Sequence, residues 1–421
     1  MKKPLYLVIY PYKFIEHIYN YLELGAFKLH CNIEVWDLSA FLTPSFSNAY
    51  ASDRLNVNDV IVIKTLNEFT QRLKQLNALI PETNLCVFNA IPFQSTRDLV
   101  CHFLIKRYLK KPNVAILKAY YSGIPTHFYK HGEGLASDLS LSARINRLFK
   151  TSTSINEITK RVGSLVFNKL AEFIPSTATH LLVAGEHYLQ VAKSNKTVSQ
   201  SAKFVNFHCQ DFSNYLLRRE LVPNQNNTVK DYAVLLDAPG PMFTSDYTLL
   251  KRKVFLTTEV WYPALTSFFD KLEADTGVSV KIAGHYKAKH PAIAPCFGNR
   301  EVYYNQTKDL VLNAKFVITR SSASTSYAVM FHKPVIFIYS DQLKQDDLAM
   351  YDILGMAHML GTNALNINEY PEKIDNFLQV NEKKYDEYRD ACLTSAPGSL
   401  RPNVQTILED IMMINTNRAF N

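Results

Sequence analysis

Polar side chains that could do chemistry follow apolar segments in the second half of the chain. Asp237, His285 and the pair Ser321 and Ser322 each come shortly after a run of apolar residues. If these runs are parallel strands, their carboxyl ends meet at one edge of a sheet, where open α/β proteins bind their ligands. We therefore expect these side chains to line a single crevice.

The same side chains are of the types that bind a phosphorylated ligand. The segment TRSSAST at 319–325 precedes a predicted helix, and hydroxyl and backbone N–H groups at a helix N-terminus bind phosphate, although a plain helix cap would use the same serines. Histidine and lysine after a strand can neutralise the charge of a diphosphate or of a leaving nucleoside monophosphate. The candidate ligands are His285, Lys287, Thr307, Arg320, Ser321 and Ser322.

Two carboxylates are candidates for acid, base or nucleophile. Glu133 lies between two glycines in YKHGEG, where the backbone can approach a ligand closely, so it could serve as a general acid or base or lie in a surface turn. Asp237 lies between YAVLL and APGP and could be a nucleophile or a cap for the following amides.

The elements that would position these residues alternate between strand and helix in both halves of the chain. Strands are predicted at 5–10, 33–38, 59–64, 85–89, 114–118, 180–184, 232–236, 278–283, 316–319 and 335–339. Helices are predicted at 15–29, 68–79, 95–109, 258–273, 307–313, 322–331, 371–392 and 404–413, the last two packing back across both halves. The pattern indicates an α/β protein with two domains, 1–225 and 226–421, joined through the polar stretch at 223–230.

Composition narrows the class of protein. The 421 residues are 47% hydrophobic and 20% charged, as in globular proteins, and a net charge of +8 favours an anionic partner. Six scattered cysteines predict reduced thiols without a structural metal, and no apolar run is long enough to span a bilayer, so we expect a cytoplasmic protein. The aromatic residues do not alternate with basic ones as in nucleic-acid platforms. The basic clusters at 106–111 and 251–253 would be solvated or contact the inner face of the membrane.

Four longer segments resemble one family of enzymes. The sequence around 260–285, 297–311, 316–329 and 333–338 resembles bacterial two-domain transferases of surface polysaccharide synthesis that use CMP-activated 2-keto acid sugars. Within this group it looks most like the retaining β-Kdo transferases and the related pseudaminic acid transferases. The resemblance implies the GT-B architecture, in which two Rossmann-like domains face each other across a cleft.

The resemblance also implies roles for particular residues. Glu133 would be the general acid or base of an acidic-Gly motif, and Asp237 the nucleophile of a strand-Asp turn. Ser321 and Ser322 would hold the CMP phosphate. His285 would be the histidine of a His-Pro motif. Tyr286 replaces the expected proline there, and a true His-Pro pair follows at 290–291, so His290 is the alternative.

The function implied is metal-independent transfer of a Kdo-type sugar from CMP to a lipopolysaccharide O-antigen or capsule, with retention through a covalent adduct on Asp237. Its partners would be the CMP-sugar donor and a glycan acceptor, with no cofactor and no nucleic acid. One alternative is a CMP-pseudaminic or other nonulosonic acid transferase, retaining or inverting with Glu133 as base. Another is a noncatalytic protein that binds CMP and assembles with other transferases.

Overall fold

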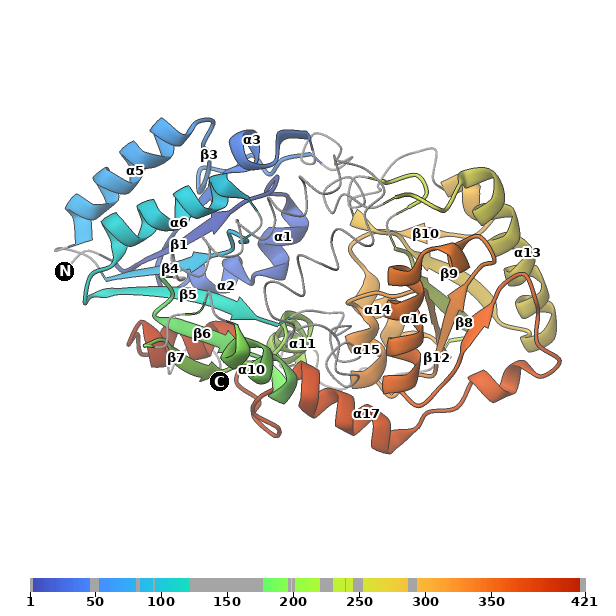
Figure 1. Cartoon of the computed structure of the whole chain (residues 1–421). Helices are drawn as coiled ribbons and strands as arrows, with labels where there is room; N and C mark the ends of the chain where they lie inside the picture. The colour runs from blue at the N-terminus through green and yellow to red at the C-terminus, as the bar shows by residue number, and fades with distance from the viewer. Residues whose placement is uncertain are drawn as a thin grey trace, which may run out of the picture.

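The structure is a computed structural model of the whole chain, in which two parallel sheets lie side by side with helices packed on them (Figure 1). It describes residues 3–45, 53–80, 84–93, 95–121, 177–195, 198, 201–219, 230–238, 240–244, 253–286 and 294–416. The strands of the first sheet lie between residues 5 and 206, and those of the second between 232 and 366. The predicted domain boundary at 225 lies outside the described residues and stays a prediction.

The first sheet has seven parallel strands in the order β3-β2-β1-β4-β5-β6-β7. Strand β1 is almost entirely buried because both its faces are covered by helices, which explains its continuous apolar sequence LYLVIY. The strands are β1 (Leu5–Tyr10), β2 (Asn32–Asp37), β3 (Val60–Val62), β4 (Leu85–Asn89), β5 (Val114–Tyr120), β6 (His180–Val183) and β7 (Lys203–Asn206).

The second sheet has six parallel strands in the order β10-β9-β8-β11-β12-β13. Its central strand β8 is buried along its whole length, and Asp237 is the first residue after it. The strands are β8 (Tyr232–Leu236), β9 (Ser279–Ala283), β10 (Val302–Tyr303), β11 (Val317–Thr319), β12 (Val335–Tyr339) and β13 (Ala364–Asn366).

Helices follow most strands, as the predicted alternation requires. Those of the first domain are α1 (Glu16–Tyr21), α2 (Leu24–Lys28), α3 (Ser39–Leu42), α5 (Leu66–Leu79), α6 (Thr96–Leu109), α10 (Gly185–Ser194) and α11 (Gln210–Arg219). Those that follow β8 are α13 (Thr258–Thr276), α14 (Thr307–Asn313), α15 (Thr325–Met330), α16 (Asp347–Met359), α17 (Glu382–Tyr388) and α18 (Asn403–Thr406). Among the described residues, no helix combines the length and apolar character needed to cross a membrane.

The closing segments of the chain return to the first domain, as predicted. Figure 1 shows α17 leading from the second sheet toward the first, and the π-helical turn Arg389–Leu393 then packs on α10. At this contact Gly185 has φ +84°, and a Cβ there would lie 2.2 Å from the carbonyl oxygen of Ala391. Glycine is thus required both by the backbone angle and by the close approach of the two segments.

Several helix boundaries differ from the sequence prediction. The single helix expected at 15–29 is two short helices, because Glu23 adopts a left-handed conformation with φ 57° between them. The helix expected at 322–331 begins only at Thr325, and the one expected at 371–392 is divided into shorter pieces. Strand β7 was not predicted because its residues KFVN are mostly exposed and show no apolar alternation.

Candidate functional site

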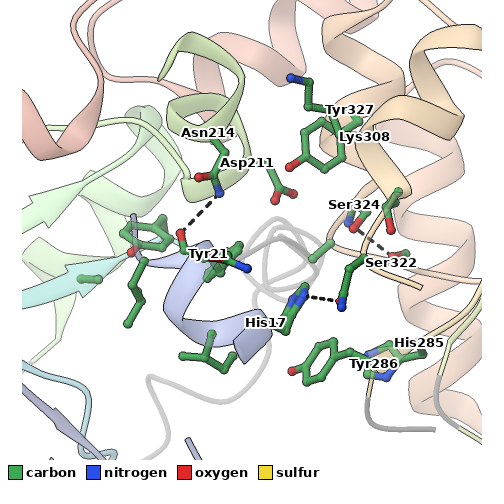
Figure 2. A pocket seen from close by; sticks show the side chains of 18 of the residues that line it. His17, Tyr21, Asp211, Asn214, His285, Tyr286, Lys308, Ser322, Ser324 and Tyr327 are labelled. Atoms are coloured by element: carbon green, nitrogen blue, oxygen red, sulfur yellow. Dashed lines mark hydrogen bonds between the residues drawn. The ribbon is translucent and has the colours of Figure 1, made fainter. Parts of the chain in front are cut away.

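A cavity of about 750 Å³ lies between the two domains, at the carboxyl ends of strands from both sheets. Its first-domain wall comes from the ends of β4 and β5 and from helices α1 and α11. Its second-domain wall comes from the residues after β8, β9 and β11 and from the start of α14 and α15. Figure 2 shows side chains of both walls directed toward the same space. This location is the one expected for ligand binding in open α/β folds.

The second-domain wall brings together most of the residues singled out from the sequence. Asp237, His285 and Ser321 line the cavity, so the prediction that they share one crevice is confirmed. The other predicted ligands on this wall are Thr307, at the start of α14, and Ser322. The roles assigned to these side chains stay predictions.

Asp237 lies in an environment that disfavours its charged form. Burial raises the pKa of this carboxyl group to about 7, while the nearby Arg320 guanidinium and the backbone N–H groups of His285 and Ala238 act in the opposite direction. Desolvation prevails over these stabilising contacts. Asp237 can therefore change its protonation state near neutral pH, a property common among catalytic carboxyl groups.

Arg320 lies behind the cavity rather than in its wall. Its Nη2 donates a hydrogen bond to the carbonyl oxygen of Ala238 at 2.9 Å, and its guanidinium lies 5.1 Å from the ring centroid of Trp261. The side chain is 8% exposed. These contacts fix the turn that carries Asp237 and place a positive charge near the carboxylate.

Ser321 and Ser322 lie in a turn that precedes α15, and not in the first turn of that helix as predicted. The backbone N–H of Ser324 donates to Ser322 Oγ at 3.3 Å, which orders the turn at the edge of the cavity. Lys308, the second residue of α14, also lines the cavity and was missed in the sequence. Its position directly after Thr307, at a predicted helix start, was the signal that could have identified it.

The first-domain wall contributes aromatic and acidic side chains that sequence reasoning missed. The His17 ring stacks on Tyr286 with centroids 4.2 Å apart, and Tyr286 stacks on His285 at 4.6 Å, so helix α1 contacts the loop after β9 (Figure 2). His17 Nδ1 also lies 3.3 Å from Asn305 Oδ1. Burial lowers the pKa of His17, which favours the neutral ring.

A second contact between the domains lies at the other side of the cavity. The Ser326 hydroxyl of α15 donates to Asp211 Oδ2 of α11 at 2.5 Å. Burial raises the pKa of Asp211 to about 6, and hydrogen bonds from Ser326 and Tyr327 limit the increase. The two walls are thus joined by an aromatic stack and by a hydrogen-bonded carboxylate.

Two predicted site residues, Glu133 and Lys287, lie outside the described residues, as does the alternative motif histidine His290. Within the described ranges, no group of three or more histidine, cysteine, aspartate or glutamate side chains is arranged to hold a metal ion.

Comparisons with known proteins show the fold. Neither the protein-family models nor the curated proteins yield a match to the sequence. Among solved structures, the wall teichoic acid polymerase TagF is 13% identical, with a TM-score of 0.50 over 98% of this chain and 90% of that chain. A variant of TagF is 12% identical, with a TM-score of 0.51 over 98% of this chain and 90% of that chain. MurG from Acinetobacter baumannii is 10% identical, with a TM-score of 0.43 over 98% of this chain and 100% of that chain. With its two parallel sheets, the chain has the predicted GT-B type fold of two Rossmann-like domains.

Proposed function

We propose that this protein is a glycosyltransferase that moves a Kdo-type 2-keto acid sugar from a CMP-sugar to a bacterial surface glycan. The observation that carries the proposal is the grouping of Asp237, His285 and Ser321 around one cavity between two Rossmann-like domains. A cavity of about 750 Å³ has room for a nucleotide sugar. The fold shared with TagF, whose name states that it is a polymerase of wall teichoic acid, is consistent with a role in glycan synthesis.

The second-domain wall has the groups that a nucleoside monophosphate would need. In the proposed complex, the hydroxyl groups of Thr307, Ser321 and Ser322 donate hydrogen bonds to the CMP phosphate, and His285 and Lys308 neutralise its charge. Lys287 belongs to the same set on the grounds of sequence alone. A monophosphate carries no diphosphate bridge that would call for a metal ion.

The proposed reaction uses two carboxylates in sequence. An oxygen of Asp237 forms a bond to the anomeric carbon while the bond from that carbon to the phosphate oxygen breaks, and CMP leaves with the electron pair. Glu133 then takes the proton of the acceptor hydroxyl, whose oxygen attacks the same carbon and releases the Asp237 carboxylate. Since the pKa of Asp237 is about 7, its nucleophilic form increases as the pH rises through neutrality.

The same raised pKa favours one competing mechanism. A carboxyl group that stays protonated would only hold together the loop after β8, which contains Ala238, and the loop after β9, which contains His285. The reaction would then be an inverting transfer with Glu133 as base. This mechanism would suit a pseudaminic or other nonulosonic acid donor. The anomeric configuration of the product, measured by NMR, separates the two, because two displacements retain the configuration and one inverts it.

The experiment that tests the proposal is an assay of nucleotide release from a panel of CMP-, UDP- and GDP-sugars in the presence of bacterial surface glycans. We expect CMP release from 2-keto acid donors alone. Asp237→Asn should lower the rate at least about a thousandfold while CMP affinity stays nearly unchanged, and Asp231→Asn, at an exposed position before β8, is the control. Release of UDP or GDP would refute the donor class. CMP binding without turnover of any donor would favour the noncatalytic assembly protein.

A further inference from the structure

A lysine in the first-domain wall has no role in the donor site proposed above. Lys118 lies near the carboxyl end of β5 and lines the cavity together with Asn89, the last residue of β4. Phe88 of β4 pairs with Leu117 of β5 in the parallel sheet. The next residues of the two strands, Asn89 and Lys118, are therefore neighbours. Both therefore point to the same face of the sheet, the face covered by α6.

The Lys118 ammonium lies over an aromatic ring that is itself stacked on a second ring. Its Nζ lies 4.2 Å from the ring centroid of Phe93, and that ring stacks on His102 with centroids 3.9 Å apart and planes 7° apart. A cation over the face of an aromatic ring is attracted by the ring quadrupole, so these contacts favour one position of the flexible lysine side chain. The position is at the wall of the cavity.

The loop beneath Lys118 is ordered by a chain of hydrogen bonds. The backbone N–H of Ile91 donates to Asn89 Oδ1 at 3.1 Å, and Asn89 Nδ2 lies 3.4 Å from His102 Nδ1. His102 Nε2 lies 3.1 Å from the carbonyl oxygen of Pro92. Burial lowers the pKa of His102 to about 3, so the ring is neutral, and the contacts assign the proton to Nε2. The network gives Lys118 a rigid support without adding a charge.

No described carboxylate forms a hydrogen-bonded pair with Lys118. The charge of Asp98 raises the pKa of Lys118 by electrostatic attraction without a hydrogen bond. The Asp98 side chain instead accepts a hydrogen bond from the backbone N–H of Ser95 at 2.8 Å in the cap of α6. Burial lowers the pKa of Lys118 to about 8. Lys118 is half-buried in the cavity wall, and an ammonium partly withdrawn from water is stabilised by an anion that binds beside it, so the site favours a negatively charged ligand.

We propose that Lys118 and the Asn89-His102 network form an acceptor subsite that binds an acidic group, a carboxylate or a phosphate, of the glycan. The assignment to the acceptor rests on the proposed transferase function. It follows from the position of Lys118 in the first-domain wall, whereas Asp237, Ser321 and the other donor-side candidates come from the second-domain wall. The subsite would select acidic acceptors over neutral ones.

Two lysine variants of the full chain, one in each wall, test whether the acidic sugar and CMP bind to different walls. Lys118→Met removes the ammonium and keeps the length of the side chain, and Lys308→Met does the same in the opposite wall. The probes are glucuronate, glucose 1-phosphate and neutral glucose for the first-domain wall and CMP for the second, titrated by calorimetry. We expect Lys118→Met to weaken binding of the acidic sugar about tenfold or more with CMP affinity unchanged, and Lys308→Met to do the reverse.

A measurement on the unmodified protein keeps the test valid if a variant does not fold. Acetylation of lysines, followed by mass spectrometry, should be slowed at Lys118 by an acidic sugar and not by glucose. Protection by glucuronate alone identifies a carboxylate acceptor, and protection by glucose 1-phosphate alone identifies a phosphate. Equal effects of neutral and acidic sugars, or a loss of CMP affinity in Lys118→Met, would overturn the proposal. If CMP fails to bind the wild type while glucuronate still protects Lys118, the proposed function fails and the anion subsite remains.

Discussion

A buried carboxylate outside the cavity gives the most quantitative prediction. Glu23, at the corner between α1 and α2, is 4% exposed and accepts hydrogen bonds from the Ser213 hydroxyl and, at 3.3 Å, from the backbone N–H of Val404. Burial raises its pKa from 4.5 to about 7, more than these two hydrogen bonds lower it. The residue joins three segments that are far apart in the sequence, so its protonation affects how they pack.

The sign of the effect follows from proton binding. Because the pKa of Glu23 is higher in the folded protein than in the unfolded chain, the folded state binds more protons between pH 4.5 and 7. The free energy of unfolding therefore falls as the pH rises through this window. From pH 5 to pH 8 the loss due to Glu23 amounts to about 2 to 3 kcal/mol.

The variant Glu23→Gln removes the titration and can keep the network. In the wild type, Ser213 Oγ accepts a hydrogen bond from the backbone N–H of Asn403 at 2.7 Å. In the variant it can keep this bond and also accept one from the glutamine amide NH₂, while the glutamine amide oxygen accepts from the backbone N–H of Val404. We expect the stability difference between wild type and variant to shift by about 2 to 3 kcal/mol between pH 5 and 8, in favour of the variant at high pH.

The assay is guanidinium unfolding followed by tryptophan fluorescence and, because two domains need not unfold together, by hydrogen exchange at the Val404 amide. Glu16→Gln, at an exposed position of α1, is the matched control for the loss of one carboxylate. If the wild type and Glu23→Gln differ by the same amount at pH 5 and pH 8, the assigned pKa and the reasoning from burial are refuted.

Three further predictions concern the site and the packing around it. Arg320→Met removes a charge that lowers the pKa of Asp237, so the acidic limb of the pH profile of CMP release should move to higher pH, and an unchanged profile would contradict the electrostatic role of Arg320. Ser322→Ala should weaken CMP binding about tenfold in calorimetry, and wild-type affinity would remove this hydroxyl from the donor site. Gly185→Ala would place a Cβ 2.2 Å from the Ala391 carbonyl and should destabilise the first domain by more than about 2 kcal/mol in denaturant unfolding, whereas a smaller loss would show that the contact can relax.

Part of the second-domain wall could be predicted from the sequence because the residues concerned follow short apolar strands. Strand β8 is apolar along its length, and the polar residue that ends each such run must lie at the carboxyl edge of a parallel sheet. Asp237, His285 and Ser321 were identified in this way. The order of strand and helix likewise predicted the class of fold, since buried parallel strands have a strong pattern.

The contacts between the two walls could not be predicted because they join residues far apart in the chain. The stacking of His17 on Tyr286 and the hydrogen bond between Ser326 and Asp211 depend on how the two domains meet, which leaves no local pattern. The break between α1 and α2 has the same origin. Glu23 adopts a left-handed backbone in contact with groups 190 and 381 residues later in the chain, and a helical period cannot reveal such partners.

The measurement that tests the central claim most directly is the intact mass of the protein after brief incubation with CMP-Kdo in the absence of an acceptor. The account predicts a population heavier by one sugar residue, with the added mass located on the peptide that contains Asp237 and absent from Asp237→Asn. A wild-type protein that releases CMP from the donor without gaining this mass, or an adduct that persists in Asp237→Asn, would contradict the assignment of Asp237 as the nucleophile.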